Sequence, residues 1–234
     1  NIDWLFSNYK FQEISENIDE LIILNLEKNK KIDKNFINSV KKIIKNCFIP
    51  ITIGGNINTL KDASIYMGSG ADKILINSLL TKDPQECKKI SKKYGSQCIV
   101  AGIDYINEKK KIYVLNKCGK FETDLKKFIE KIIKIGCGEI LLQSISNDGC
   151  GYGLDLSILK FLKNHKVPHI LMGGVGNSKH ILEGLKNKNV DGIATANLLN
   201  FIGDTFEKTR SLLLKNNLHI VNFHKHDYKD LKNK

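Results

Sequence analysis

The chain of 234 residues is 41% hydrophobic and 26% charged, and it carries a formal net charge of +12. This length allows one or two domains with a well-buried core, and the composition is that of a globular protein, which excludes a disordered or fibrous chain. The longest apolar runs are about as long as one buried strand and far below the roughly 18 residues of a membrane helix, so no membrane crossing is expected. The N-terminal segment has acidic residues inside its apolar part and no small-residue cleavage site, which is unlike a signal peptide. We therefore expect a cytoplasmic protein.

The lysines and the cysteines are both scattered along the chain. Lysine clusters occur where outer helix faces and turns are expected, and no basic stripe interleaved with aromatic residues is present, so a solvated surface explains the positive charge better than a nucleic-acid site. The cysteines form no C-x-x-C pair and match no histidine spacing. We expect reduced, structural thiols, with neither a metal site nor a cofactor; the cysteines are Cys47, Cys87, Cys98, Cys118, Cys137 and Cys150.

In chain order, the sequence opens with a helical pattern and continues with seven short β-branched runs. Apolar residues between Trp4 and Ile18 recur at helical spacing. Each later run is followed by a stretch with helical spacing, and near-continuous apolar strands that alternate with helices indicate a parallel sheet covered by helices. The expected strands are residues 19–25, 49–53, 72–77, 98–104, 138–145, 167–172 and 190–196.

An internal repeat relates the two halves of the chain. Matching residues at three strands lie 119 positions apart, which is far above the repeat length of a solenoid. The repeat favours two half-barrels that close into one (β/α)8 TIM barrel, which is an α/β fold. The matched residues are Glu20 with Glu139, Gly54–Gly55 with Gly173–Gly174, and Asp72 with Asp191.

A complete barrel of this kind has eight strands and takes about 250 residues. Because seven strands are expected here, we expect the first strand to lie upstream of Asn1. The predicted organisation is a single barrel domain over residues 1–218, lacking that strand, and a polar C-terminal tail over residues 219–234.

Polar and glycine residues follow several strands, at the end of the barrel where active sites of this fold lie. Gly173–Gly174 follows the seventh barrel strand and Ala196–Asn197 the eighth, where backbone N–H groups can bind phosphate. The repeat places Gly55 and Asn77–Ser78 at the mirrored positions. Two phosphate sites on opposite sides suit a substrate with a phosphate at each end. The alternative is that these glycines only permit tight turns.

Two further groups of charged residues could carry chemistry. Asp104 ends a strand and Asp148–Gly149 follows another at the same end of the barrel, where carboxylates can move protons; each aspartate could instead cap a loop. Glu20, Lys73 and Glu139 stand at the opposite end, near the starts of alternate strands, and could share one layer of the interior. Ionisable groups in a core layer are costly unless paired, which suggests a functional reason, although side chains facing solvent would explain them as well.

These residues together resemble the cyclase (HisF-type) subunit of imidazole glycerol phosphate synthase. The resemblance extends from Ile18 to about Gly203, and its most specific runs are GADKILINS, YGSQCIV and GEILLQS. It implies a (β/α)8 barrel that receives ammonia from a glutaminase (HisH-type) subunit on its N-terminal face. The ammonia would pass through the barrel to a bis-phosphorylated ribulosyl substrate, from which two aspartates, as general acid and base, help to form an imidazole.

The resemblance also implies a role for each candidate residue. Asp104 matches one catalytic aspartate, and the other would lie in the strand expected upstream. Asp148 matches a substrate contact and Asp72 a partner-docking position. Glu20, Lys73 and Glu139 match three of four ammonia-gate residues. The substrate and phosphate positions are Gly55, Asn77, Ser78, Gly149, Gly173, Gly174, Ala196 and Asn197.

Four departures from the family pattern lie near the substrate end of the barrel, at Asn25, Asn56, Ser146 and Cys150. They resemble a HisF-like branch that works with a glutaminase and a sugar amidotransferase on acetamidino sugars of surface polysaccharides. Three functions are therefore considered: a histidine-pathway cyclase, an ammonia-relaying subunit for sugar amidination, and a phosphate- or nucleic-acid-binding module without chemistry. The third depends only on the net charge, and no nucleic-acid or membrane partner is expected.

Overall fold

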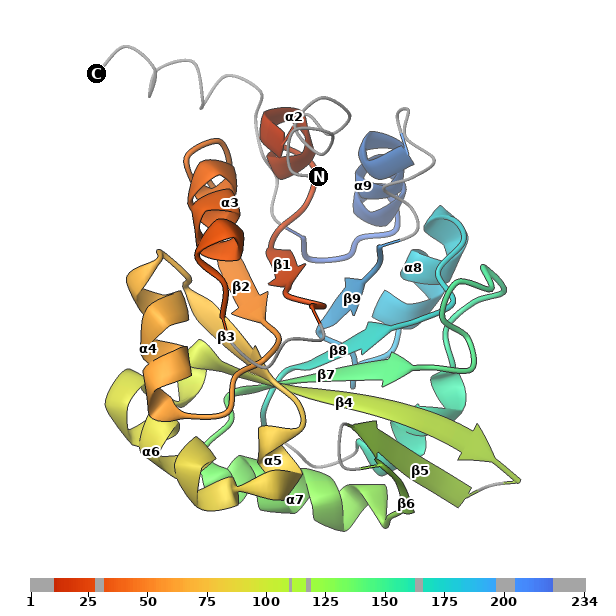
Figure 1. Ribbon diagram of the computed structural model, residues 1–234. Coiled ribbons are helices and arrows are strands. Elements are labelled where there is room, and N and C mark those ends of the chain that lie inside the picture. The colour runs from red at the N-terminus through yellow and green to blue at the C-terminus, as the bar shows by residue number, and fades with distance from the viewer. Residues whose placement is uncertain are drawn as a thin grey trace.

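The computed structural model describes residues 11–27, 32–109, 111–116, 119–162, 166–196 and 205–220. Seven parallel strands form one curled sheet, and every strand expected from the sequence is confirmed (Figure 1). Each of these seven strands except the last pairs with the parallel strand that comes next along the chain, as the alternation of strands and helices predicted. The strands, in spatial order, are β1 (Leu21–Leu24), β2 (Ile51–Gly54), β3 (Lys73–Ile76), β4 (Ile99–Glu108), β7 (Glu139–Ser144), β8 (His169–Met172) and β9 (Gly192–Ala194).

Helices lie on the outer side of the sheet (Figure 1). Helix α7 (Leu125–Ile135) shows why: it buries Leu125, Ile129 and Ile132, begins at an Asp124 side-chain cap and ends at a left-handed Gly136. The first described helix, α2 (Phe11–Ser15), is part of the helix expected from Trp4 to Ile18. The others are α3 (Lys34–Ile44), α4 (Leu60–Gly68), α5 (Leu79–Lys82), α6 (Pro84–Tyr94), α8 (Ser178–Leu185) and α9 (Thr205–Lys215), with 3₁₀ turns at η1 (Ser96–Cys98) and η2 (Leu156–Phe161).

Strands β1 and β9 are the two edges of the sheet in the described part of the chain. The Arg210 side chain of α9 donates to Asp19 Oδ1 at 2.8 Å and to the Asn17 carbonyl at 3.2 Å, just before β1. The last described helix therefore touches the segment that leads into the first described strand, as the curvature of a (β/α)8 barrel requires. Closure by a further strand stays a prediction.

The sequence analysis missed a hairpin. Strand β4 runs four residues beyond Asp104 and pairs antiparallel with β5 (Lys111–Asn116), which pairs with β6 (Gly119–Glu122). The signal was the alternation within KIYVLN, where Ile112 and Val114 are buried and their neighbours are more exposed. A run of lysines at residues 109–111 predicts a surface turn. Lys109 does adopt the left-handed backbone conformation common in turns, with a φ of 49°.

The sheet separates two layers of apolar side chains. Ile74 and Ile76 belong to the main core between the sheet and the helices, whereas Leu75 packs with Val100 and Leu141 in a separate cluster inside the barrel. Because side chains alternate along a strand, Lys73 and Asn77 share the inner face with Leu75. The same parity directs Glu139 inward at the start of β7. The interior thus has an apolar centre with polar groups at both ends.

The repeat is confirmed for β1 with β7 and for β3 with β9, but β2 and β8 differ from the predicted offset. The register pairs Leu24 with Gly54 and Gln143 with Met172, so β8 is shifted by one position and the offset here is 118. Gly55 therefore corresponds to Gly173, and Asn56 corresponds to Gly174. Asn56 keeps the positive φ of that position, at 58°.

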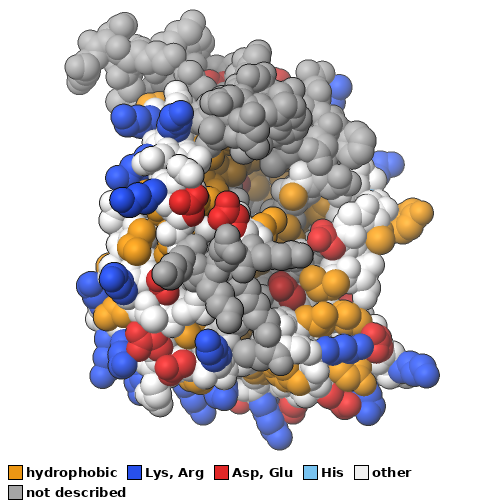
Figure 2. All heavy atoms as spheres, viewed as in Figure 1, with side chains coloured by type: hydrophobic (Ala, Val, Ile, Leu, Met, Phe, Trp, Pro, Cys, Tyr) orange, Lys and Arg blue, Asp and Glu red, His pale blue; other side chains and the backbone are white. Residues whose placement is uncertain are grey.

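The face of the molecule in Figure 2 agrees with the expectation that the lysines form a solvated surface. Lysine and arginine side chains are spread around the rim of the face in Figure 2 and do not gather over one element. Among the described residues, no helix combines the length and the apolar character needed to cross a membrane.

Candidate functional site

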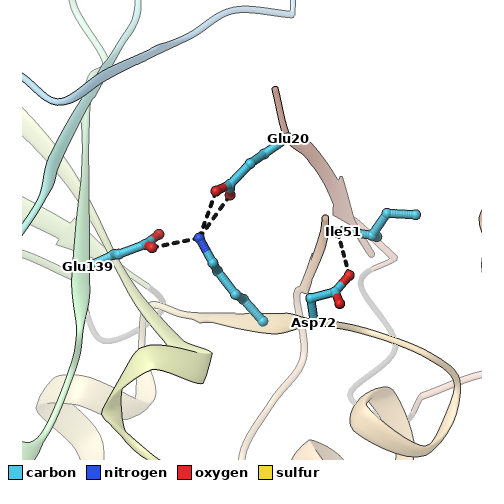
Figure 3. Close-up of polar contacts among 5 residues, drawn as sticks. Glu20, Ile51, Asp72 and Glu139 are labelled. Carbon is cyan, nitrogen blue, oxygen red and sulfur yellow. Dashed lines mark hydrogen bonds and ion pairs between the residues drawn. The ribbon is translucent and has the colours of Figure 1, made fainter. Parts of the chain in front are cut away.

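Three ionisable side chains converge at the N-terminal end of the barrel, where we call them the charged layer: Glu20, Lys73 and Glu139. The Lys73 ammonium donates to Glu20 Oε1 at 2.8 Å and Oε2 at 3.0 Å, and to Glu139 Oε1 at 2.5 Å. Figure 3 shows Glu20, just before β1, and Glu139, at the start of β7, pointing toward the same nitrogen. The expectation that these side chains share an interior layer is confirmed, and an orientation toward the outside is excluded.

The charged layer is well shielded on one side. The Lys73 and Glu139 side chains are only 16% and 17% exposed, whereas Glu20 is 39% exposed. Burial is the largest single effect on Lys73 and favours its neutral form, but the hydrogen bonds and charges of Glu139 and Glu20 outweigh it and raise the pKa of Lys73. In the described part of the chain, Glu139 Oε2 is buried without a hydrogen-bond partner. The raised pKa keeps Lys73 charged, and the layer keeps one acceptor unused.

Asp72 has a structural contact next to this layer. Its Oδ2 accepts a hydrogen bond at 2.8 Å from the Ile51 backbone, at the start of β2 (Figure 3). Asp191 does the same for the His169 backbone at 2.8 Å, which places the two repeat aspartates in equivalent roles. A structural reason for Asp72 therefore exists beside the docking role, which stays a proposal.

Replacing Asp72 by Ala is expected to destabilise the protein by about 1 kcal/mol, because one strand-capping hydrogen bond to a carboxylate is lost. Urea unfolding measures this change. Asp72→Asn, which keeps an acceptor oxygen, is the control and should lose less. An unchanged urea midpoint in Asp72→Ala would remove the structural role and leave docking as the only explanation.

The opposite end of the barrel, which we call the mouth, holds Asp104 and Asn77. Asn77 Nδ2 donates to Asp104 Oδ2 at 3.0 Å, so the two residues expected at neighbouring strand ends are in contact. Burial, the largest effect, raises the pKa of Asp104; the negative charge of Asp148 raises it further, and the Asn77 hydrogen bond partly offsets both. A carboxyl group with a raised pKa is suited to giving and taking protons.

Asp148 lies at the same mouth and is held by a residue that the sequence analysis did not select. Gln143 Nε2 donates to Asp148 Oδ2 at 3.1 Å. Gln143 is two positions past the interior residue Leu141, so its inward direction follows from strand parity alone. That parity was the available signal, but the contact depends on the path of the loop after β7.

Neighbouring backbone atoms leave no room for a side chain at the two glycines after β8. A Cβ added to Gly174, which has a φ of 93°, would lie 2.0 Å from the Gly153 carbonyl oxygen. A Cβ on Gly173 would lie 2.5 Å from the Ser144 carbonyl oxygen. Gly153 N–H also donates to the Gly174 carbonyl at 2.7 Å. The tight-turn explanation therefore has direct structural support, and phosphate binding at these glycines stays a proposal.

The remaining phosphate positions are distributed around the mouth. Gly55 follows β2 with a φ of 92°, and its carbonyl accepts from the Tyr66 hydroxyl at 2.8 Å. Ser78 directly precedes α5, and Gly149 has a φ of 74° in the loop after β7. Ala196 is exposed after β9, and Asn197 lies outside the described residues.

Within the described ranges, the cysteine thiols and the acidic side chains form no further candidate site. Cys47, Cys87 and Cys137 are buried free thiols, and burial raises the pKa of both Cys87 and Cys137 to about 12. Cys150 is exposed near the mouth, and Cys118 lies outside the described residues. Among the residues that the structure describes, no group of three His, Cys, Asp or Glu side chains is placed to hold a metal ion.

Comparison with protein families gives a match over most of the chain. The model of a family described as histidine biosynthesis protein matches residues 8–204. This range includes the charged layer, Asp104, Asp148 and all the candidate phosphate positions.

Individual relatives carry two kinds of name. A provisionally named imidazole glycerol phosphate synthase subunit hisF2 of Parasynechococcus marenigrum is 37% identical over 210 residues, covering 88% of this chain and 78% of the relative. The imidazole glycerol phosphate synthase subunit HisF of Exiguobacterium sp. is 34% identical over 203 residues, covering 86% and 79%. A second provisionally named hisF2 subunit, of Campylobacter jejuni, is 36% identical over 188 residues, covering 80% and 75%.

Proposed function

Because the chain belongs to the histidine biosynthesis protein family, we propose that it is the ammonia-using cyclase subunit of a glutamine amidotransferase complex of the imidazole glycerol phosphate synthase type. The observation that carries this proposal is the charged layer. Its Lys73 bridges Glu20 and Glu139 at the N-terminal end of a barrel whose opposite end holds Asp104 and Asp148.

The charged layer is the entrance for ammonia in this proposal. Burying a lysine and two carboxylates costs several kcal/mol unless the charges are paired, and a purely apolar layer would stabilise the fold at least as well. An ionised layer instead offers a place where a small polar molecule can exchange hydrogen bonds. Movement of Lys73 away from one glutamate opens the path toward the mouth.

In this proposal the cyclisation takes place at the mouth. Asp104, with its raised pKa, exchanges a proton with the substrate, and Asp148 contacts the substrate next to it. Backbone N–H groups after β2, β3, β7, β8 and β9 hold the two phosphates of a bis-phosphorylated ribulosyl substrate. The positions proposed for this are Gly55, Asn77, Ser78, Gly149, Gly173, Gly174, Ala196 and Asn197.

A glutaminase of the HisH type is the proposed partner on the N-terminal face, where Asp72 lies next to the charged layer. Relatives of this chain are named as subunits of a synthase, which supports a multi-subunit assembly. Ammonia released by the glutaminase would enter beside Lys73 without passing through bulk water.

A second function is favoured by the altered mouth. Asn25 is buried at the end of β1, and its Nδ2 has no hydrogen-bond partner in the described part of the chain. Ser146 and Cys150 lie in the exposed loop after β7. Two of the relatives carry the name hisF2 in place of HisF. In this alternative the barrel relays ammonia to a sugar amidotransferase and cyclises nothing.

Product formation from ammonium salts and the ribulosyl substrate tests the proposal. The purified full-length protein, with the strand expected upstream of Asn1, should form imidazole product without a glutaminase, because ammonia then reaches the mouth directly. Chromatography of the products detects it. Absence of product, together with glutamine-dependent sugar amidination when a glutaminase and a sugar amidotransferase are added, would replace the cyclase by the relay.

A further inference from the structure

Two pairs of side chains, each an amide with a carboxylate, stand next to one another at the mouth. Asn77 donates to Asp104 at 3.0 Å and Gln143 donates to Asp148 at 3.1 Å. We propose that Gln143 is a positioning residue, which holds the Asp148 carboxylate at the mouth beside Asp104. This inference rests on the proposed function and adds to it the residue that fixes the substrate-contacting aspartate.

The strand register places Gln143 where it can do this. Asp104 of β4 and Gln143 of β7 are direct partners in the parallel ladder, so their side chains leave the sheet on the same face, one strand apart. Leu141, two residues before Gln143, is buried in the interior cluster. The Gln143 amide therefore projects from a rigid strand at the level of Asp104.

Asp148, by contrast, belongs to an exposed loop. It lies in the turn that follows β7, next to Gly149 with its positive φ, and no strand fixes its direction. Among the described residues, Gln143 is the side chain that donates to its carboxylate, through Oδ2. The hydrogen bond thus ties a loop carboxylate to the sheet.

The choice of an amide has a chemical consequence. A lysine or arginine in this position would neutralise Asp148, whereas the neutral Gln143 amide orients the carboxylate and leaves its charge in place. That charge contributes to the raised pKa of Asp104. The Asp148 oxygen that faces away from Gln143 is available to accept from a substrate hydroxyl or N–H group. Gln143 therefore favours a substrate rich in hydrogen-bond donors at this point.

Kinetics of the full chain with ammonium salts test the positioning role through a double-mutant cycle. Gln143→Met keeps the side-chain length and removes the donor. We expect KM to increase by up to about 10-fold, which corresponds to the free energy of one hydrogen bond to a charged group, and kcat to change less. Because Gln143 acts through Asp148, the double variant Gln143→Met/Asp148→Asn should be no worse than Asp148→Asn alone. Wild-type KM in Gln143→Met, or effects that multiply in the double variant, would overturn the proposal.

Asn107→Leu is the matched control, since it also removes an exposed carboxamide that donates to a neighbouring side chain. Asn107 Nδ2 donates to Ser157 Oγ at 2.8 Å, on the face of β4 opposite Asp104. Its KM should equal that of the wild type. Urea midpoints of all variants establish that a changed KM is not a folding defect.

A measurement on the protein alone separates this inference from the proposed function. NMR titration of the carboxyl carbons follows Asp104 directly; the groups that face its carboxylate in the described structure are Asp148 and the uncharged Asn77. Gln143→Met should lower the titration midpoint of Asp104, in the same direction as Asp148→Asn, because the second charge moves away. This result with no cyclase activity in any variant would retain the positioning role and reject the cyclase. An unchanged midpoint, with an active wild type, would reject the positioning role alone.

Discussion

Asp104→Asn is expected to lower the rate of imidazole formation from ammonium salts by a factor of roughly 10² to 10⁴, the usual contribution of a general acid or base. The amide is nearly the same size as the carboxyl group but cannot take up and release a proton. Chromatographic measurement of the product over time gives the rate. The loss should appear mainly in kcat, because Asn at this position can still contact Asn77.

The direction of the Asp104 pKa provides the control for folding. In the folded chain this pKa is raised, so the folded state binds the proton more tightly than the unfolded state does. Stability contributed by the protonated group is therefore full at pH below the unfolded pKa and falls as pH rises through the folded pKa. Asn resembles the protonated form, so Asp104→Asn should not destabilise the protein at neutral pH. A large drop in its urea midpoint would make the kinetic loss uninterpretable as proton transfer.

The relay predicts the opposite kinetic result. If the barrel only conducts ammonia, glutamine-dependent amidination by the complex should remain largely intact in Asp104→Asn. Measuring both reactions with one variant therefore decides between the two functions.

Lys73→Met is expected to lower glutamine-dependent product formation by at least about 10-fold while sparing the reaction with added ammonium salts. Lys73 bonds both glutamates of the charged layer, and its loss leaves two carboxylates facing one another across the entrance. Free ammonia reaches the mouth from solvent and does not need this entrance. The same change should destabilise the protein by about 2 kcal/mol, because a buried acceptor of Glu139 loses its partner.

Lys89→Met is the matched control for this experiment. Lys89 also pairs with a glutamate at 2.8 Å, Glu86, but it is exposed on the outside of α6. The Lys89→Met variant should form product from glutamine and from ammonium salts at the same rates as the wild type. Equal glutamine and ammonium activities in Lys73→Met, with a glutaminase shown to be bound, would return the charged layer to a purely structural role.

The sheet could be predicted from the sequence because each strand carries its own signal. The runs in β2, β3, β4 and β7 are rich in Ile, Val and Leu, and burial on both faces makes them mostly apolar. The hairpin of β5 and β6 is exposed on one face and rich in lysine. Its weaker alternation was therefore lost among residues that resemble a solvated loop.

The repeat predicts residue positions only as far as the segments between strands have equal lengths in the two halves. The segment from Glu139 to Pro168 is one residue shorter than the segment from Glu20 to Pro50, and this moves the glycine match by one position. A strand carries no mark of this shift in its composition. Asn56 is tolerated at the position equivalent to Gly174 because asparagine adopts a left-handed backbone more readily than most residues.

The candidate site could be predicted where a side chain's place follows from its strand. Four of the site's residues lie at or next to a strand end, and Asp104 lies within β4. Strand parity directs all of them inward; the four are Glu20, Lys73, Asn77 and Glu139. Gln143 has the same parity, yet its partner Asp148 is set by the conformation of a loop. Loop paths depend on many tertiary contacts at once, so such pairs are not encoded in any local pattern.

The length of β4 bears on how this barrel tolerates change. Asp104 lies in mid-strand, paired with Leu115 of β5 on one edge and with Gln143 of β7 on the other. Its amide should exchange slowly with deuterium, because β4 is paired with a neighbouring strand on each edge at this point. A group anchored in this way keeps its place whatever the surrounding loops do. Divergence in substrate can then proceed through the segments after β1, β2 and β7, where mutations accumulate without disturbing the acid.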